Sequence, residues 1–168
     1  MEIRQLTHAD AAEYRQLRLR GLREDPEAFG TTYDEELARP LTLIQERLRG
    51  SAGGFTLGAF DGTLIGVVTL VREVRAKSRH RATVIGMYVA AEVRGRGVGR
   101  ALLVAACARA RQIDGLEQLH LAVVTTNAPA RHLYRSLGFQ AYGLEPRALK
   151  LGDRYWDEEL MVLYLRRT

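Results

Sequence analysis

The sequence predicts a mixed α/β fold that forms a single domain over residues 1–168. Strand-sized apolar runs alternate with segments of helical periodicity, and no low-complexity tract or linker divides the chain. The length lies within the usual range for one domain, roughly 100–200 residues. Hydrophobic residues make up 46% of the chain, which allows a sizeable core and excludes a disordered protein.

The N-terminal part predicts one strand and two helices. Residues 1–6 alternate as a short strand, and Thr7 or Asp10 can cap the helix that follows. That helix is interrupted, and helical spacing resumes over residues 34–48. We therefore expect two helices, or a bent pair, before the main part of the sheet.

A β-hairpin and a central strand come next. Residues 55–60 and 64–74 have strand character, and the dipeptide Asp61-Gly62 between them is typical of a two-residue hairpin turn. Residues 83–90 are almost continuously apolar and contain β-branched side chains. This pattern predicts a largely buried, central strand.

The C-terminal half alternates helices and strands. The predicted elements are a helix, a strand, a helix and a strand, at residues 98–113, 118–124, 127–137 and 155–165. The first two form a right-handed βαβ unit with the strand at residues 83–90. The segment 142–150 is expected to be a loop.

The positive charge is concentrated in the middle of the chain. The formal net charge is +5, and residues 72–111 hold ten basic and two acidic side chains. Such a field suits an anionic ligand, and composition alone leaves nucleic acid, an acidic lipid surface and a phosphorylated cofactor open. Residues 72–81 have no interleaved aromatic side chains, so we interpret this run as a solvated hairpin end and expect no nucleic-acid partner.

The cysteine content and the N-terminal residues indicate the cellular compartment of the protein. Cys107 is the only cysteine, which excludes an intrachain disulfide and favours a reducing compartment, the cytoplasm. Its place in an alanine-rich helix suggests a buried apolar role rather than a nucleophile. We find no apolar export signal and no membrane-length apolar run, so no membrane association is expected.

Three alternating glycines mark a candidate phosphate-binding loop at a helix start. The loop consists of Arg94, Gly95, Arg96, Gly97, Val98 and Gly99. Free N–H groups and the positive end of the helix favour an anion there, and Arg100 adds charge to that of the loop arginines. An arginine-bearing turn without a ligand is the alternative. The spacing matches neither a Walker A motif nor the G-x-G-x-x-G dinucleotide motif.

Two motifs resemble those of the GCN5-related N-acetyltransferases (GNAT). The first is Arg94-x-x-Gly97-x-Gly99, which follows a strand ending in Gly86-Met87-Tyr88-Val89. The second is Asn127-x-x-Ala130-x-x-Leu133-Tyr134-x-x-x-Gly138-Phe139, after the next strand. The order of predicted elements also fits, so the resemblance covers most of the chain.

The resemblance implies a twisted, mostly antiparallel mixed sheet that splays open between its fourth and fifth strands and is flanked by about four helices. Acetyl-CoA would lie in the gap as cosubstrate, with the pantetheine on backbone groups of Met87, Tyr88 and Val89. Residues 94–100 would hold the pyrophosphate. Asn127 would touch the cofactor arm, and it can also cap the helix that begins there.

Acetyl transfer to an amine needs a neutral amine, a polarised carbonyl and a proton donor for the thiolate, and it needs no metal. The resemblance makes Tyr134 the general acid. The alternative is an aromatic ring that only packs beside Leu133. For the general base, the family often has a glutamate on the fourth strand, where this chain has Thr83. The remaining candidates, acting directly or through water, are Glu73, His80, His120 on the fifth strand, and Glu145 after the sixth.

The acceptor is expected to be a small primary amine, acetylated by direct transfer in a ternary complex. The segments that rim the cleft carry aromatic and acidic side chains that suit a cationic amine, although these acids are also typical of solvated surface. They are Phe29, Tyr33, Asp34, Glu35, Glu36, Tyr142, Glu145, Arg147, Tyr155, Trp156, Asp157, Glu158 and Glu159. Alternatives are a protein or peptide N-acetyltransferase and a non-catalytic acetyl-CoA-binding module, and a homodimer is compatible with the sequence.

Overall fold

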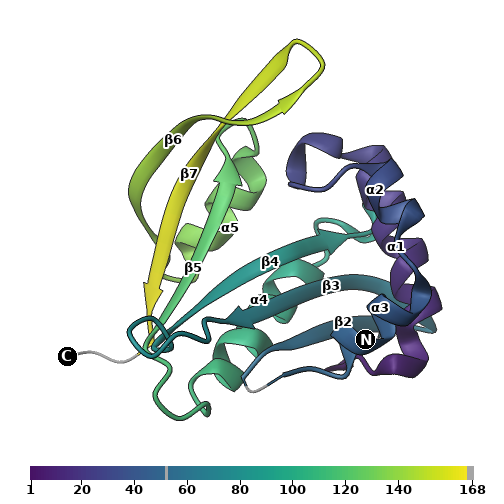
Figure 1. The fold of residues 1–168 in the computed structure, drawn as a ribbon, viewed down its shortest axis with the longest axis horizontal. Helices are drawn as coiled ribbons and strands as arrows, with labels where there is room; N and C mark the ends of the chain where they lie inside the picture. Colours follow the sequence, from purple (N-terminus) through teal and green to yellow (C-terminus); the bar gives the residue numbers. More distant parts are fainter. Residues whose placement is uncertain (52, 166–168) are drawn as a thin grey trace.

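The computed structural model describes residues 1–51 and 53–165. These residues form one seven-stranded mixed sheet with the strand order β1-β2-β3-β4-β5-β7-β6 (Figure 1). The strands are β1 (Glu2–Gln5), β2 (Phe55–Asp61), β3 (Thr63–Arg72), β4 (Arg81–Val89), β5 (Gln118–Val124), β6 (Gln140–Leu151) and β7 (Arg154–Tyr164). The α-helices are α1 (Ala11–Glu24), α2 (Tyr33–Ala38), α3 (Leu41–Leu48), α4 (Val98–Ala110) and α5 (Ala128–Ser136), and short 3-10 helices are η1 (His8–Asp10), η2 (Pro26–Ala28) and η3 (Ala91–Val93). The predicted mixed α/β fold is confirmed.

The sheet opens between β4 and β5, as the family resemblance implied. These two strands run parallel and pair only over Arg81–Thr83 and Gln118–His120, at the start of each strand. Beyond that point they diverge, and Figure 1 shows the gap widening toward α1 and α2. All other neighbouring strands pair antiparallel. The carboxyl end of β4 is therefore free of a partner on its β5 side.

Helices pack closely on both faces of the strands that lead to this gap. On one face α1 approaches β4 at Gly21, where a Cβ atom would lie only 2.9 Å from the ring of Tyr88. On the other face α4 covers β3, and a Cβ atom on Gly66 would lie 3.0 Å from Leu102, which is fully buried. A side chain at Gly21 would clash with the Tyr88 ring, and one at Gly66 would force Leu102 to shift. Within the described residues, no helix has the length and apolar character to cross a membrane.

The predicted helix over residues 34–48 is two helices, so this expectation was wrong. Pro40 separates α2 from α3, because its ring removes a backbone N–H and disfavours helical geometry in the preceding residue. Arg39 accordingly has an extended backbone, with ψ of 126°. Thr32 begins α2 by accepting a hydrogen bond from the N–H of Glu35 at 3.2 Å.

The segment 142–150, which was expected to be a loop, lies within β6. This strand pairs with β7 at the sheet edge, and most of its residues are exposed. It therefore lacks the apolar alternation that predicts a strand. Its register also shifts between Glu145 and Leu149, where Arg147 has a φ of +51°. Glu145 consequently lies inside the sixth strand rather than after it.

Candidate active site

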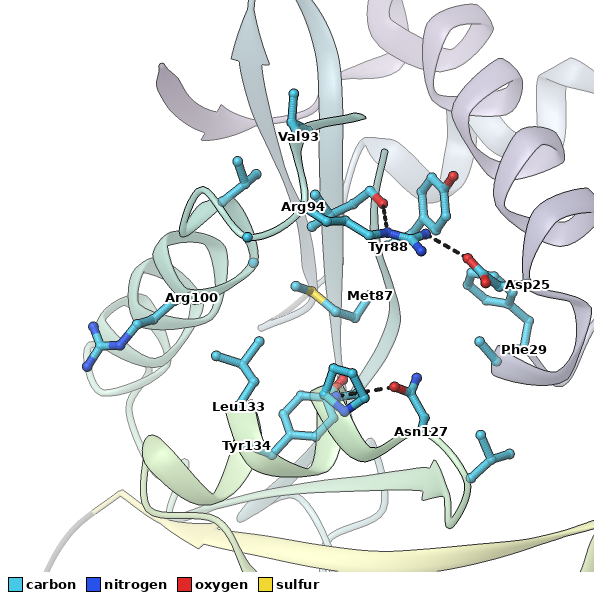
Figure 2. Close-up of a pocket in the computed structure, with 18 of the residues that line it drawn as sticks. Asp25, Phe29, Met87, Tyr88, Val93, Arg94, Arg100, Asn127, Leu133 and Tyr134 are labelled. Atoms are coloured by element: carbon cyan, nitrogen blue, oxygen red, sulfur yellow. Dashed lines mark hydrogen bonds and ion pairs between the residues drawn. The ribbon is translucent and has the colours of Figure 1, made fainter. Parts of the chain in front are cut away.

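A cavity of about 630 Å³ opens where β4 and β5 diverge (Figure 2). Its walls come from the end of β4, the glycine loop, the first turns of α4 and α5, and the segment after α1. The residues predicted to bind the cofactor that line it are Met87, Tyr88, Val89, Arg94, Gly95, Gly97, Val98, Gly99, Arg100, Asn127 and Tyr134. Arg96 is the exception, since it lies exposed on the loop outside this lining. The two sequence motifs therefore meet at one site.

An irregularity in β4 directs backbone groups into this cavity. The register with β3 shifts beside Gly86, which has a left-handed φ of +61°. The N–H of Ala90 donates to the carbonyl of Ile65 at 2.9 Å, and hydrogen-bonded and non-hydrogen-bonded residues alternate along an antiparallel ladder. The N–H and C=O of Val89 consequently point away from β3, toward the gap beside β5.

The glycine loop leaves open space for an anion. Gly95 and Gly97 have φ angles of +74° and +80°, and a Cβ atom on either would meet nothing within 4 Å. Gly97 is the N-cap of α4, so no side chain satisfies the free N–H groups of the first helical turn. Gly99 serves packing instead, because a Cβ atom there would lie 3.0 Å from the Met87 side chain. Two of the three glycines thus shape the loop, and the third brings α4 against β4.

The Arg94 side chain is directed away from the glycine loop. Its Nη2 atom lies 2.6 Å from Asp25 Oδ2, and its Nε atom donates to the carbonyl of Val89 at 2.9 Å (Figure 2). Its guanidinium also stacks 5.5 Å from the ring centre of Tyr88. Arg94 therefore fastens the end of β4 to the segment after α1. Arg100 instead lines the cavity at the start of α4, and it forms no ion pair with any of the described residues.

The side chain of Tyr88 faces α1. Its hydroxyl donates a hydrogen bond to Glu24 Oε2 at 2.7 Å, and burial together with this carboxylate raises the pKa of Tyr88 to about 12. Its ring lies 6.1 Å from that of Phe29, centre to centre. Anchoring the side chain on the helix leaves the backbone of β4 to form the cavity wall.

Asn127 and Tyr134 enter the cavity from α5. Asn127 caps this helix, since its Oδ1 atom accepts a hydrogen bond from the N–H of Ala130 at 3.2 Å (Figure 2). This contact uses the side-chain oxygen and leaves the side-chain nitrogen available as a hydrogen-bond donor. Tyr134 is 7% exposed and packs edge-on against Phe139. Burial raises the pKa of its hydroxyl to about 12, so the phenol is protonated near neutral pH.

The proposed bases lie apart from this cavity. Glu73 and His80 line a separate cavity of about 850 Å³ beside the basic turn, at the opposite end of β4. Tyr88 lies eight positions after His80 along the chain, a span of roughly 25 Å for extended backbone. His120 pairs with Thr83 where β4 and β5 are still joined, and burial lowers its pKa. Glu145 is exposed and stands opposite a second glutamate on β7.

Cys107 lies buried in α4 and does not line the cavity. Burial raises the pKa of its thiol, which disfavours the thiolate. The structure therefore supports the apolar role expected for this residue.

A second cavity of about 320 Å³ adjoins the first. The segment after α1 forms one side and the β6–β7 hairpin forms the other, and the lining includes Phe29, Leu149, Leu151 and Trp156. Phe29 and Glu27 line both cavities. Sequence reasoning identified Phe29 and Trp156 as rim residues but missed Glu27 and Asp25, because nothing in the local pattern distinguishes these acids from solvated surface.

Several acids that were expected at the acceptor site serve the fold instead. Glu35 caps α2, Glu36 is fully buried beside an arginine at the end of that helix, and Glu159 is held by two arginines of α5 at 2.5 Å each. Glu27 and Asp34 are the acids that do line the second cavity. Fewer acids therefore line the second cavity than the sequence suggests.

Comparison with known proteins assigns the family. The family model of the GNAT acetyltransferases matches residues 16–139. The L-amino acid N-acetyltransferase AaaT of Escherichia coli K12 is 29% identical over 162 residues, which cover 94% of this chain and 95% of that protein. A GNAT acetyltransferase structure from Streptococcus pneumoniae has a TM-score of 0.88 at 27% identity, covering 97% of this chain and 98% of that chain. The phosphinothricin acetyltransferase of Sinorhizobium meliloti in complex with acetyl-CoA has a TM-score of 0.83 at 21% identity, covering 97% and 87%. With its sheet, its cleft and both motifs in place, the chain belongs to the GNAT family and is an acetyl-CoA-dependent N-acetyltransferase.

Proposed function

We propose that this enzyme acetylates the primary amine of a small molecule by direct transfer in a ternary complex. One observation carries the proposal: the cavity at the β4–β5 gap adjoins a second cavity of about 320 Å³, and Glu27 and Phe29 line both. A pocket of roughly 300 Å³ is the size that a small ligand fills. Adjoining cavities allow both substrates to be bound at once. A covalent acetyl-enzyme is not needed, and the buried Cys107 is poorly placed to form one.

The glycine loop fits the pyrophosphate of acetyl-CoA. Open space beside Gly95 and Gly97 lets backbone N–H groups approach an anion, and the N-terminus of α4 adds its partial positive charge. Arg100 supplies a full charge beside them. In this proposal the outward-facing N–H of Val89, whose carbonyl already accepts from Arg94, binds the pantetheine arm, and the side-chain nitrogen of Asn127 donates to it.

Tyr134 is proposed to stabilise the leaving thiolate. When bound, acetyl-CoA supplies its acetyl group as a thioester, whose departing thiol has a pKa of about 8.5. A phenol with a pKa of about 12 is a much weaker acid than this thiol, so complete proton transfer to the thiolate is unfavourable. Tyr134 therefore acts mainly by donating a hydrogen bond to the sulfur while negative charge develops there.

We assign the base role to Glu158. It pairs directly with Val124 in the β5–β7 register, and directly opposed residues project from the same face of a sheet. Val124 lines the cofactor cavity, while Trp156, two residues before Glu158 and therefore on its face, lines the second cavity. Burial and the nearby Glu145 raise the pKa of Glu158. A carboxylate with a raised pKa is a stronger base toward the acceptor ammonium.

A competition between acceptor classes tests the proposed function. Labelled acetyl-CoA is offered with a mixture of small amines and, separately, with a library of peptides that have free N-termini and lysines. Mass spectrometry of the products and release of free thiol are measured. We expect small amines to be acetylated at rates well above those of peptides. Acetylation of peptides alone would establish the protein-substrate alternative, and cofactor binding without thiol release would establish a non-catalytic module.

A cytoplasmic location is part of the proposal, since a lone free cysteine fits a reducing compartment.

A further inference from the structure

Arg18 is a buried cation without a counter-ion. It lies in the middle of α1 and is 6% exposed, and its Nε and Nη1 atoms are fully buried with no hydrogen-bond partner. No carboxylate of the described residues lies within ion-pair distance of it. The two other buried charged side chains are neutralised, because Glu36 lies 3.2 Å from Arg39 and Glu159 is held by two arginines. Removing a guanidinium from water without a partner costs free energy, and buried charges in proteins are therefore normally paired.

The surroundings of Arg18 place it behind the wall of the cleft. Its guanidinium carbon lies 4.9 Å from the ring centre of Phe29, the residue that lines both cavities. Its Nη1 atom lies 3.6 Å from the point where a Cβ atom of Gly86 would be. Gly86 immediately precedes Met87, the first β4 residue in the cofactor cavity. Arg18 thus stands between the end of β4 and the residue at which the two cavities meet.

The stacked arrangement leaves the guanidinium able to bind an anion. Contact with an aromatic face occupies one face of the planar group, and the N–H donors lie in its plane, where Nη2 is the one nitrogen that is not fully buried. Those donors match the two oxygens of a carboxylate, with which arginine forms paired charge-assisted hydrogen bonds. A neutral acceptor can offer only an uncharged oxygen to these donors, and it leaves the positive charge of the guanidinium uncompensated.

We propose that Arg18 binds a carboxylate of the acceptor, so that the substrates of this enzyme are α-amino acids or closely related amino carboxylates. This inference rests on the proposed function, because it concerns the acceptor of that reaction. In an α-amino acid the carboxylate is one carbon away from the amine. An acceptor bound at Phe29 therefore presents its carboxylate to Arg18 and its amine toward the β4 side of the cofactor cavity.

A matched set of three acceptors tests the inference: an α-amino acid, its primary amide and its decarboxylated amine. The wild type is expected to prefer the amino acid by about 10- to 100-fold in kcat/KM, the range for a hydrogen bond to a charged group. Arg18→Met should abolish this preference by raising KM for the amino acid, while it leaves the amide and amine unchanged. Arg18→Lys, which keeps the charge without the paired geometry, should lie between. Arg20→Met on the same helix is the control, since Arg20 pairs with Glu24 and Glu92 at the surface.

Thermal stability supplies a readout that does not depend on turnover. With coenzyme A present, the amino acid should raise the melting temperature of the wild type but not that of Arg18→Met. Arg18→Met alone should be at least as stable as the wild type, because it removes an unpaired buried charge. The inference is overturned if the wild type accepts the amide as well as the amino acid, if the amino acid gives no stabilisation, or if Arg18→Met slows all three acceptors equally. Failure to release thiol with any acceptor would instead refute the proposed function, and the stability measurement would still decide the role of Arg18.

Discussion

The two halves of the cleft are built in different ways. The cofactor half, residues 86–100 and 127–134, consists of short continuous segments that present backbone groups and glycines with positive φ. The acceptor half, residues 22–34 and 149–156, brings together side chains from opposite ends of the chain. A ligand site formed by local backbone geometry leaves a motif in the sequence, and a site formed by tertiary assembly does not. Substitutions in each half therefore test this division.

The largest effect is expected in the loop of the cofactor half. Gly97→Asp places a side chain in the space left open at φ +80° and brings a negative charge to the helix start. Charge repulsion against the pyrophosphate, together with displacement of the loop to relieve backbone strain of roughly 1–2 kcal/mol, should weaken acetyl-CoA binding by at least about 100-fold in calorimetric titration.

Two control variants separate strain from charge. Gly97→Ala carries the strain without the charge and should weaken binding by less. Gly62→Asp carries similar strain, because Gly62 has a φ of +77° with nothing within 4 Å of a Cβ atom, but it lies in the β2–β3 turn. It should lower stability and leave affinity for acetyl-CoA unchanged. Unchanged affinity of Gly97→Asp would contradict the assignment of the loop.

The second effect concerns Tyr134, a side chain of the cofactor half. Tyr134→Phe removes the proposed hydrogen bond to the thiolate and keeps the packing against Phe139. We expect kcat to fall by about 100-fold, with the dissociation constant of acetyl-CoA almost unchanged. Tyr142→Phe, on the exposed strand β6, is the matched control and should keep full turnover. Wild-type turnover in Tyr134→Phe would remove this residue from the mechanism.

The third effect appears in the dependence of kcat/KM on pH. Glu158 must be ionised to act as a base, and its pKa is raised by burial and by Glu145. The rate should therefore fall as pH drops through this raised pKa, at a higher pH than an ordinary glutamate would give. Glu145→Gln removes the neighbouring charge, lowers the pKa of Glu158 and should move the acidic limb to lower pH. Glu158→Gln should remove this limb along with most of the activity. An acidic limb that stays in place in Glu145→Gln would argue for water or another base.

The difference between the halves also explains which features were predictable from the sequence. The central strand, the glycine loop and both motifs follow from local residue patterns. The splayed sheet and the cavity residues were anticipated through the family resemblance that these motifs carry. The direction of the Arg94 side chain was not predictable, since it depends on Asp25, which lies far away in the chain. The edge strand β6 has too little buried surface for a periodic pattern. Arg18 has the appearance of a surface arginine on an amphipathic helix until the packing of α1 against β4 is known.

The smallest effect is expected where the two halves are joined by charge. Asp25 and Arg94 form an ion pair at 2.6 Å, but their side chains are 34% and 46% exposed. Exposed pairs of this kind contribute about 0–1 kcal/mol, because solvent screens them and their ordering costs side-chain entropy. A double-mutant cycle of Asp25→Asn and Arg94→Gln, followed by urea denaturation, should therefore give a coupling energy below about 1 kcal/mol.

Arg94→Gln alone should cost more stability than Asp25→Asn, since Arg94 also donates to the Val89 carbonyl and stacks on Tyr88. If the pair served mainly to align the acceptor half with the cofactor half, Asp25→Asn would instead raise KM for the acceptor and leave acetyl-CoA binding unchanged. We expect the KM for the acceptor to stay unchanged in Asp25→Asn, because Phe29 also contacts Tyr88 and continues to hold the two halves together through apolar packing. A large coupling energy, or a selective rise in the acceptor KM, would show that the halves are joined by charge rather than by packing.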